Sequence, residues 1–516
     1  MNKPIPKLCG IETEYAISMR NAQGGNSFGC TSHQATRLVR EQIELFPQAY
    51  YSLLGEWTIS GARCYEDHFH LEWSTPSTVS ARRLVALVKA GDAVVNEARA
   101  RASEQGHDII IVANNTDGQV SYGSHLNILL ARETFDQLFD YRPHIFYRVW
   151  VPHLVTSMVY AGAGTICTAT RDRQAQYQLS QRAAFMETAR IHEITTSRRS
   201  LINSRDEALA DPERYARLHI ISFDSNMHEF ALWLKIGTSQ LIMSMLECCF
   251  QPIDLTLRNP ISAIREIARD PKLRTKVELQ DGRSLTAIEI QEEIATMASR
   301  FVEAGYDEGS VPDASQIVSA WLDTLDKLRR DPNECVGRVD WIAKASLLSM
   351  HRRKSGVGWD DPSMKVLDHM YANIDPAIGL YHTVFLRNNI AERVVTDDEI
   401  ASYMSKAPDD SRAWLRTRCI ERFGDSITRM DWRYIDFRNK QQFDSGSVRL
   451  NMDDPFEYTC SELESIFDSV SSLAEFLSHF PTVNAPSEMY NSFDPYPLYD
   501  DNTSYYDYYN NNNWRY

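Results

Sequence analysis

The chain has 516 residues, of which 43% are hydrophobic, so it can bury a sizeable core in one large domain with appendages or in two to four domains. Its 54 Lys and Arg residues against 70 Asp and Glu residues give a formal net charge of −16, which argues against general binding to nucleic acid or to an anionic membrane surface. The nine cysteines are scattered without a C-x-x-C pair, so the sequence indicates neither a disulfide framework nor a zinc ribbon and fits a reducing cytoplasm.

The first expected element is an acidic strand over residues 10–17. Because side chains alternate along a strand, Glu12 and Glu14 share one face, and Ile11 and Tyr15 share the other. A strand that is apolar on one side and doubly anionic on the other is typical of a sheet that faces a divalent cation, although a solvated surface strand would carry the same pattern. Residues 21–32 are expected to form a loop and residues 33–48 a helix.

The run from Gly61 to Thr75 has an unusual density of ionisable residues for a strand. If residues 63–67 are extended, Arg63, Tyr65 and Asp67 lie on one face and Glu66 on the other. A cation, a phenol and a carboxylate on one face fit a site for a hard metal and a phosphate substrate. An internal salt bridge beside a hydrogen-bonded tyrosine would explain the same residues without a ligand.

A break at Thr75-Pro-Ser-Thr supplies an N-cap for a helix expected near residues 79–104. A β-hairpin is predicted next, with strands over residues 108–113 and 124–131 joined by turn residues 114–118. On its second strand, His125 and Asn127 face away from the apolar side that carries Leu126.

From about residue 134 the pattern becomes largely helical, and the apolar stretch 149–167 is expected to be a buried helix rather than a membrane span. Residues 196–219 concentrate arginines in an otherwise acidic protein, as a polyphosphate site requires. These arginines are Arg198, Arg199, Arg205, Arg214 and Arg217. The sequence predicts a large catalytic domain over residues 1–390, a small C-terminal domain over 391–480 and a disordered, low-complexity tail rich in Tyr and Asn over 481–516.

Nine motifs, taken together and in order, resemble the Pup ligase and depupylase family of carboxylate-amine ligases, which are related to glutamine synthetase. The motifs span about residues 8–480 and leave the tail outside. They are Gly10-Ile-Glu-Thr-Glu-Tyr, Gly61-Ala-Arg-x-Tyr-x-Asp with a following Glu72, Asn114-Asn-Thr-Asp, Ser121-Tyr-Gly-Ser-His-x-Asn, Leu179-Ser-Gln-Arg, Ile202-Asn-Ser-Arg-Asp-Glu, Arg217-Leu-His, Asp224-Ser-Asn-Met and Leu234-Lys-x-Gly-Thr.

The resemblance implies an α+β fold in which ATP and Mg²⁺ bind over a curved antiparallel sheet packed with helices, and a small C-terminal domain closes on the nucleotide. The metal ligands that it implies are Glu12, Glu14, Tyr65, Glu72 and His125. The nucleotide contacts that it implies, together with the arginine cluster, are Arg63, Thr75, Arg198, Arg199, Arg205, Arg217 and Trp432. If Tyr65 and Glu72 are to reach one metal cluster, a bulge or a break must separate Asp67 from Glu72, because the two ligands lie on opposite faces of an ideal strand.

Asp67 matches the catalytic aspartate of that family. In ligases this residue accepts a proton from the incoming lysine, and in depupylases it serves in the hydrolysis of an isopeptide bond or of a C-terminal glutamine amide. A carboxylate beside magnesium and arginines has its pKa lowered and stays ionised, as this role requires.

The motifs point in two directions within the family. The short stretch from Gly10 to Arg63 is typical of ligases, whereas the part from Val277 to Arg422 is typical of depupylases. Three departures mark a divergent member: Leu126 replaces a Glu, Leu209 replaces a His, and an acid that usually follows the Glu72 segment is missing from Ser74-Thr-Pro-Ser-Thr.

We therefore predict an enzyme that acts on a carboxylate, amide or isopeptide group of Pup or another small modifier, with depupylase-like hydrolysis ahead of ligation. A Pup ligase is the second hypothesis. An ATP-binding pseudoenzyme that serves as an interaction module is the third.

Overall fold

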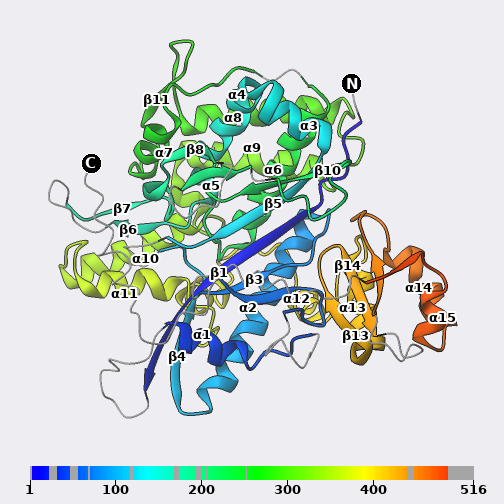
Figure 1. Cartoon of the computed structure of the whole chain (residues 1–516). Helices are drawn as coiled ribbons and strands as arrows, with labels where there is room; N and C mark the ends of the chain where they lie inside the picture. Colours follow the sequence, from blue (N-terminus) through cyan, green and yellow to red (C-terminus); the bar gives the residue numbers. More distant parts are fainter. Residues whose placement is uncertain are drawn as a thin grey trace, which may run out of the picture.

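A computed structural model describes residues 3–21, 32–46, 56–67, 70–116, 121–167, 174–191, 199–204, 206–250, 253–438 and 447–485, so the predicted tail beyond 485 lies outside the described residues. The fold is α+β, as predicted, and is built on an eight-stranded sheet with the order β2-β3-β1-β5-β10-β9-β8 and with β4 also paired to β1 (Figure 1). Every strand pair in it is antiparallel except β8 with β9. The strands are β1 (Cys9–Asn21), β2 (Arg63–Asp67), β3 (His70–Ser74), β4 (His107–Val112), β5 (Ser124–Ala131), β8 (Thr188–Ile191), β9 (Ser200–Asn203) and β10 (Tyr215–Ile220).

Strand β1 is the centre of the sheet, because it pairs with β3, β4 and β5. Its alternation is the predicted one: Ile11 and Tyr15 are buried, at 3% and 1% exposure, while Glu12 and Glu14 remain partly accessible. The strand therefore presents both carboxylates on the face opposite the core.

The strands β4 and β5 form where the sequence predicts them, but the predicted hairpin between them is wrong. Strand β4 pairs with residues 16–21 of β1, and β5 pairs with residues 9–13 of β1. At 13 residues, β1 is long enough to accept both partners in succession. Local turn chemistry after β4 indicated a return strand correctly, but it does not determine which strand that return strand joins.

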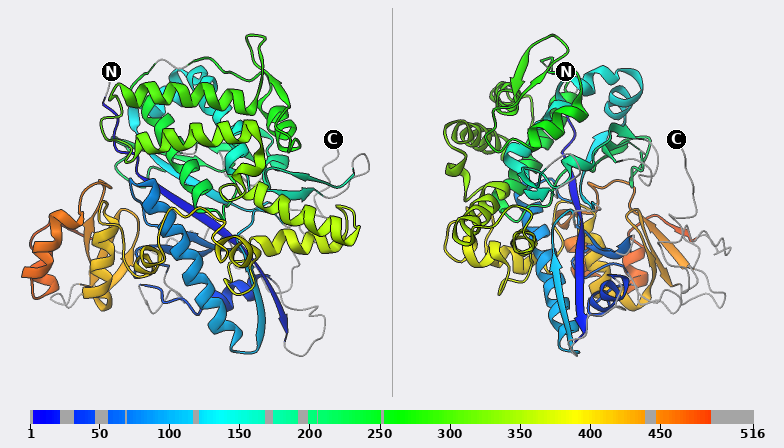
Figure 2. Two further views of the ribbon diagram at one scale, coloured as in Figure 1. Left: turned by 180° about the vertical axis from the view of Figure 1, so that it is seen from behind. Right: turned by 90° about the vertical axis from the view of Figure 1, so that its left-hand side faces the viewer.

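Helices cover one face of the sheet (Figure 2). The helix α2 (Ala81–Ser103) is capped by Ser80, and α6 (Glu229–Glu247) is buried along its whole length. The large core continues into further helices. These are α3 (Arg132–Asp136), α4 (Pro143–Thr156), α5 (Met158–Ala161), α7 (Pro260–Ala268), α8 (Ala287–Glu303), α9 (Ala314–Arg330), α10 (Asp340–Ser355) and α11 (Pro362–Tyr371), while α1 (Ser32–Arg40) lies near β1 and β3.

The prediction of a largely helical chain after residue 134 missed the strands between 165 and 220. The stretch 149–167 is helical to Ala161 and then enters β6 (Thr165–Cys167), which pairs with β7 (Gln176–Gln178). The strands β8, β9 and β10 complete the central sheet. Strands of three to six residues are too short for alternation to identify them.

The last elements gather to one side of the central sheet (Figure 1, yellow to red). They are α12 (Asp397–Tyr403), α13 (Ala413–Phe423), β13 (Ile427–Met430), β14 (Tyr434–Arg438), β15 (Ser447–Asn451), α14 (Cys460–Ser469), α15 (Leu473–Leu477) and β16 (Thr482–Asn484). Apart from α12 and β16, these elements contribute buried side chains to one hydrophobic cluster, which also includes Trp57 from the beginning of the chain.

The expectations about disulfide bonds and membrane spans can be compared with the described residues. Among these residues, every cysteine is a free thiol. None of the helices that the structure describes combines the length and the apolar character needed to cross a membrane.

Candidate active site

The hairpin of β2 and β3 places Tyr65 directly opposite Glu72. The Tyr65 hydroxyl donates a hydrogen bond of 2.6 Å to Oε1 of Glu72. The expected break between Asp67 and Glu72 is present, since β2 ends at Asp67 and β3 begins at His70. Cross-strand partners share a face, so both side chains reach the same site.

The next strand brings a second carboxylate to Glu72. Glu14 of β1 is the cross-strand partner of Glu72, and its Oε2 accepts a hydrogen bond of 2.7 Å from the Gly123 amide. One carboxylate oxygen from each of Glu14, Asp67 and Glu72 lies within 4.8 Å of the others. Burial raises the pKa of the Glu72 carboxyl well above its ordinary value, and Glu12 and Glu14 raise it further, against the hydrogen bond from Tyr65.

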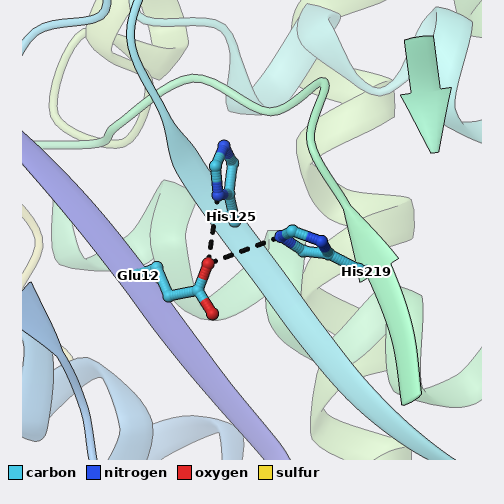
Figure 3. Close-up of side chains that lie close together, drawn as sticks. All are labelled: Glu12, His125 and His219. Atoms are coloured by element: carbon cyan, nitrogen blue, oxygen red, sulfur yellow. Dashed lines mark hydrogen bonds and ion pairs between the residues drawn. The ribbon is translucent and has the colours of Figure 1, made fainter. Parts of the chain in front are cut away.

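A second group surrounds Glu12 (Figure 3). His125 Nδ1 and His219 Nε2 lie 3.1 Å and 3.4 Å from the same Glu12 oxygen, Oε2, and Asn127 Nδ2 donates to Oε1 at 3.0 Å. Burial alone would raise the pKa of Glu12, but the contacts with His125 and His219 hold it well below its ordinary value. Burial lowers the pKa of His219 to about 4, so this imidazole is neutral near pH 7 and can serve as a ligand.

Both groups fit divalent cations. The first offers only oxygen atoms, the ligands that Mg²⁺ prefers, and the second combines one carboxylate with two imidazoles. Glu12, Glu14 and Glu72 repel one another, as the raised pKa of Glu72 shows, and a cation would relieve that repulsion.

The predicted nucleotide residues Arg63 and Trp432 are connected through Trp57. The backbone of Trp57 bridges to Arg63, and its ring packs against that of Trp432 with centroids 4.8 Å apart. Arg63 Nε donates to Glu56 at 2.6 Å, and its guanidinium lies 4.6 Å from the Tyr65 ring centroid. The C-terminal elements therefore meet the β2 strand at the edge of the carboxylate site.

Thr75, also predicted to contact nucleotide, is buried, and its Oγ1 accepts a hydrogen bond of 3.0 Å from the Ile11 amide. The hydroxyl thus ties the end of β3 to β1 and keeps its proton available for another acceptor.

The arginines of residues 196–219 take different places. Arg217 Nη1 donates to Asn127 Oδ1 at 2.8 Å and lies 3.7 Å from Glu12, so it borders the second group. Arg199 lies near Arg182, and Arg214 pairs with Asp454 at 2.8 Å in the C-terminal part. Arg198 and Arg205 lie outside the described residues. The three arginines that can be compared do not form one cluster.

Leu126 and Leu209 are two of the three positions at which the sequence departs from the family motifs, and both lie among the described residues. Leu126 is 1% exposed and belongs to the main core, on the opposite face of β5 from His125, so this change takes no side chain from the carboxylate face. Leu209 has φ of 52° and accepts a hydrogen bond from Arg412 Nη2 through its carbonyl at 2.5 Å.

The site also contains two residues that the sequence motifs did not predict as ligands. His219 and Asn127 both contact Glu12, and Asn127 is the cross-strand partner of His219. The signal was available in Arg217-Leu-His219, because positions 217 and 219 of a strand share a face. What the sequence could not give was the pairing of β10 with β5.

Comparisons with known proteins identify relatives over most of the chain. Residues 7–436 match the family described as Pup-ligase protein. A depupylase of Acidothermus cellulolyticus is 36% identical, over 84% of this chain and 91% of its own length. A Pup–protein ligase of Acidimicrobium ferrooxidans is 32% identical, over 90% of this chain and 99% of its own length.

Two solved structures have the same fold. The ligase PafA in complex with the prokaryotic ubiquitin-like protein Pup aligns with a TM-score of 0.76 at 25% identity, over 92% of both chains. PafA in complex with ADP aligns with a TM-score of 0.70 at 27% identity, over 86% of this chain and 96% of the other.

Proposed function

Because this chain belongs to the Pup ligase and depupylase family, we propose that it is an ATP- and magnesium-dependent enzyme of the depupylase type, which hydrolyses an isopeptide or side-chain amide bond of Pup or a Pup-like modifier. The observation that carries the proposal is the meeting of Glu14, Asp67 and Glu72 on three neighbouring strands. The 36% identity to a depupylase favours hydrolysis.

In this proposal Glu14, Glu72 and Tyr65 hold magnesium, and Glu12 with His125 offers a second position. Magnesium, when bound, supplies the positive charge that stabilises phosphate oxygens. Arg63 and Arg217 border the two carboxylate groups and orient the anionic phosphates, with Arg199 and Thr75 as further contacts. Trp432 packs on Trp57 and presents its ring to the base, and residues 391–480 form the unit that closes on the nucleotide.

Asp67 is the proposed catalytic residue. In hydrolysis its carboxylate accepts the proton of the attacking water, and the amine leaves with a proton as the amide bond breaks. Asp67 is placed for this role because it ends β2 beside Glu14 and Glu72, where its carboxylate borders the metal ligands.

The test uses a Pup conjugate with ATP and Mg²⁺, and measures release of free Pup. We expect Asp67→Asn to lower the rate by about 10²- to 10⁴-fold, the usual contribution of a general base. Glu66→Gln is the matched control, since Glu66 lies next to Asp67 in β2 but contacts His33 of α1 instead of the site. The depupylase proposal is wrong if the wild type releases no Pup, or if Asp67→Asn releases it at the wild-type rate.

Ligation is the second candidate, favoured by the match to 99% of the length of a Pup–protein ligase. There Asp67 accepts the proton of a lysine amine. The same assay separates the two: a ligase adds Pup to a lysine-bearing target and produces ADP and phosphate, and it does not shorten an existing conjugate.

We also propose a cytoplasmic location, which the free thiols of the described cysteines support.

A further inference from the structure

Of three motifs without an assigned role, two meet at one buried carboxylate, that of Asp224. Its oxygens accept hydrogen bonds from the Ala163 amide at 2.9 Å, the Gln181 amide at 3.0 Å and the Arg182 amide at 3.1 Å. The Ser180 hydroxyl donates a further bond of 3.1 Å. Asp224 is 3% exposed, so these donors satisfy a carboxylate that water cannot reach, and they fix the turn that carries Arg182.

The Arg182 side chain connects this turn to the backbone of Tyr122. It is 1% exposed, and its Nη1 donates to the backbone carbonyl of Tyr122. The third motif supports the same carbonyl, because Asn115 Nδ2 donates to it at 3.1 Å. Asn115 is held in turn by Gln181 Oε1, which accepts from its amide at 2.6 Å, and by the Ser225 amide, which donates to its Oδ1 at 2.6 Å.

The path ends at the metal site. Gly123 follows Tyr122, and its amide donates to Glu14 Oε2 at 2.7 Å, while its carbonyl accepts from the Glu14 amide at 3.2 Å. A Cβ atom at residue 123 would lie 2.7 Å from Glu14 Oε1 and 2.3 Å from His125 Nε2, so a larger residue there would displace the Glu14 and His125 side chains from these positions. The position of the Tyr122 carbonyl therefore sets the position of the Glu14 carboxylate.

We propose that Arg182 is a positioning residue, which holds the Tyr122–Gly123 backbone and through it fixes Glu14 at the metal site. The inference rests on the proposed function, because it presupposes a divalent cation at Glu14. The guanidinium suits this task, since a planar, multiply donating group fixes direction better than an ammonium ion does. Arg182 Nε has no hydrogen-bond partner among the described residues, so the carbonyl contact is the principal anchor of a fully buried cation.

A positioning role and a mere charge effect predict different results for metal binding when Arg182 is replaced. Arg182→Lys keeps the positive charge and loses the planar fork, so loss of positioning weakens metal binding, and a pure charge effect leaves it unchanged. Arg182→Met removes a cation beside Glu14, so a residue that acted only by its charge would bind the divalent cation more tightly after the change. Arg265→Lys is the matched control, because Arg265 also donates to a backbone carbonyl, that of Met186, and also has a buried Nε without a partner among the described residues.

The experiment titrates the nucleotide-free protein with Mn²⁺ and follows free Mn²⁺ by electron paramagnetic resonance, with thermal unfolding as the check of folding. We expect Arg182→Lys to raise the Mn²⁺ dissociation constant by about 10-fold or more, as loss of an outer-shell partner does, and Arg265→Lys to leave it unchanged. Folded Arg182→Lys protein with wild-type affinity would overturn the inference alone. A wild type that binds no Mn²⁺ would overturn the metal site, and the inference with it. Should Arg182→Lys not fold, Asn115→Ala tests the same carbonyl without a change of charge and is expected to weaken binding in the same direction, and unchanged affinity in that variant would overturn the inference.

Discussion

At the scale of single residues, Glu72 determines how the site responds to pH. Burial raises the pKa of its carboxyl well above the ordinary value, and Glu12, Glu14 and Asp67 add to the effect. The hydrogen bond from Tyr65 acts in the opposite direction, because it stabilises the ionised form. A metal binds the ionised carboxylate, so a cation at Glu72 must displace a proton wherever that carboxyl is protonated.

We therefore expect Mg²⁺ binding to release a proton and to strengthen as the pH rises toward the pKa of Glu72. Calorimetric titration of Mg²⁺ in two buffers with different ionisation enthalpies measures the number of protons released. Tyr65→Phe removes the hydrogen bond that favours the ionised form and also the hydroxyl proposed as a metal ligand. It should therefore weaken Mg²⁺ binding by about 10-fold or more, since the charged hydrogen bond alone contributes about 1.5 kcal/mol. Equal apparent enthalpies in both buffers below neutral pH would contradict this account.

The sequence predicts the direction of a side chain correctly where a single strand contains the whole alternating pattern. The alternation of Glu12 and Glu14 against Ile11 and Tyr15 is local, and it is what the structure shows. The contacts of Glu12 with His125 and His219 depend on three strands that lie far apart in the sequence, so no local pattern could give them.

At the scale of elements, the close packing of α2 against β3 holds the strand that carries Glu72. Gly91 of α2 faces Trp73, and a Cβ atom there would lie 2.6 Å from the indole Nε1 and 2.8 Å from Cδ1. Trp73 is 3% exposed and adjacent to Glu72, so the ring has little room to move. A glycine in the middle of a helix costs stability, and here it allows the helix to approach the sheet.

Gly91→Ala is expected to destabilise the protein by about 1–3 kcal/mol through overpacking, in spite of the better helix propensity of alanine. Urea unfolding measures the change. The same substitution should cost less in a Trp73→Leu background, because the clashing ring is absent there, and this coupling identifies the contact. An equal cost in both backgrounds would show that the ring is not the cause.

The sequence predicts the strands and helices that have strong periodicity, but it does not predict which strands pair with each other. The strands β4 and β5 were predicted within a residue or two, but as partners of each other, whereas both pair with β1. Turn residues fix local chain reversal, and the choice of partner depends on which strand offers a free edge and an apolar face.

At the scale of the whole molecule, buried arginines join the C-terminal elements to earlier parts of the chain. Arg416 of α13 lies 4.9 Å from the ring of Trp57 and 5.1 Å from that of Trp432, and Arg412 donates to the carbonyls of Leu209 and Met452. The sequence predicted a C-terminal unit from its composition, and its limits at 391 and 480 stay a prediction. The sequence could not reveal that Trp57, more than 300 residues earlier, belongs to the same hydrophobic cluster.

A buried histidine of α4, His153, makes the stability of the fold sensitive to acid. His153 in α4 is 0% exposed and stacks on Trp150 at 5.3 Å. Its backbone carbonyl accepts from Gln291 Nε2 at 3.2 Å, but neither ring nitrogen has a partner with hydrogen-bond geometry among the described residues. Burial lowers its pKa to about 3, against 6.5 for the ordinary group, although the Gln291 side chain acts in the opposite direction. Because the unfolded chain takes up the proton first, the stability is fully present above pH 6.5 and falls as the pH decreases toward 3.

We expect His153→Phe to reduce this acid sensitivity. Between pH 7 and pH 5, one such histidine lowers the unfolding free energy of the wild type by about 2 kcal/mol. The phenylalanine variant keeps this free energy, because it has no group to protonate at this position. At pH 7 the change should be close to neutral, because the variant removes buried polar atoms without a partner and keeps an aromatic ring. Urea unfolding at the two pH values measures both effects. His144→Phe, at an exposed position of the same helix, is the matched control and should leave the pH dependence as in the wild type. If the unfolding free energy of His153→Phe changed with pH as much as that of the wild type, His153 would not be the group that takes up the proton.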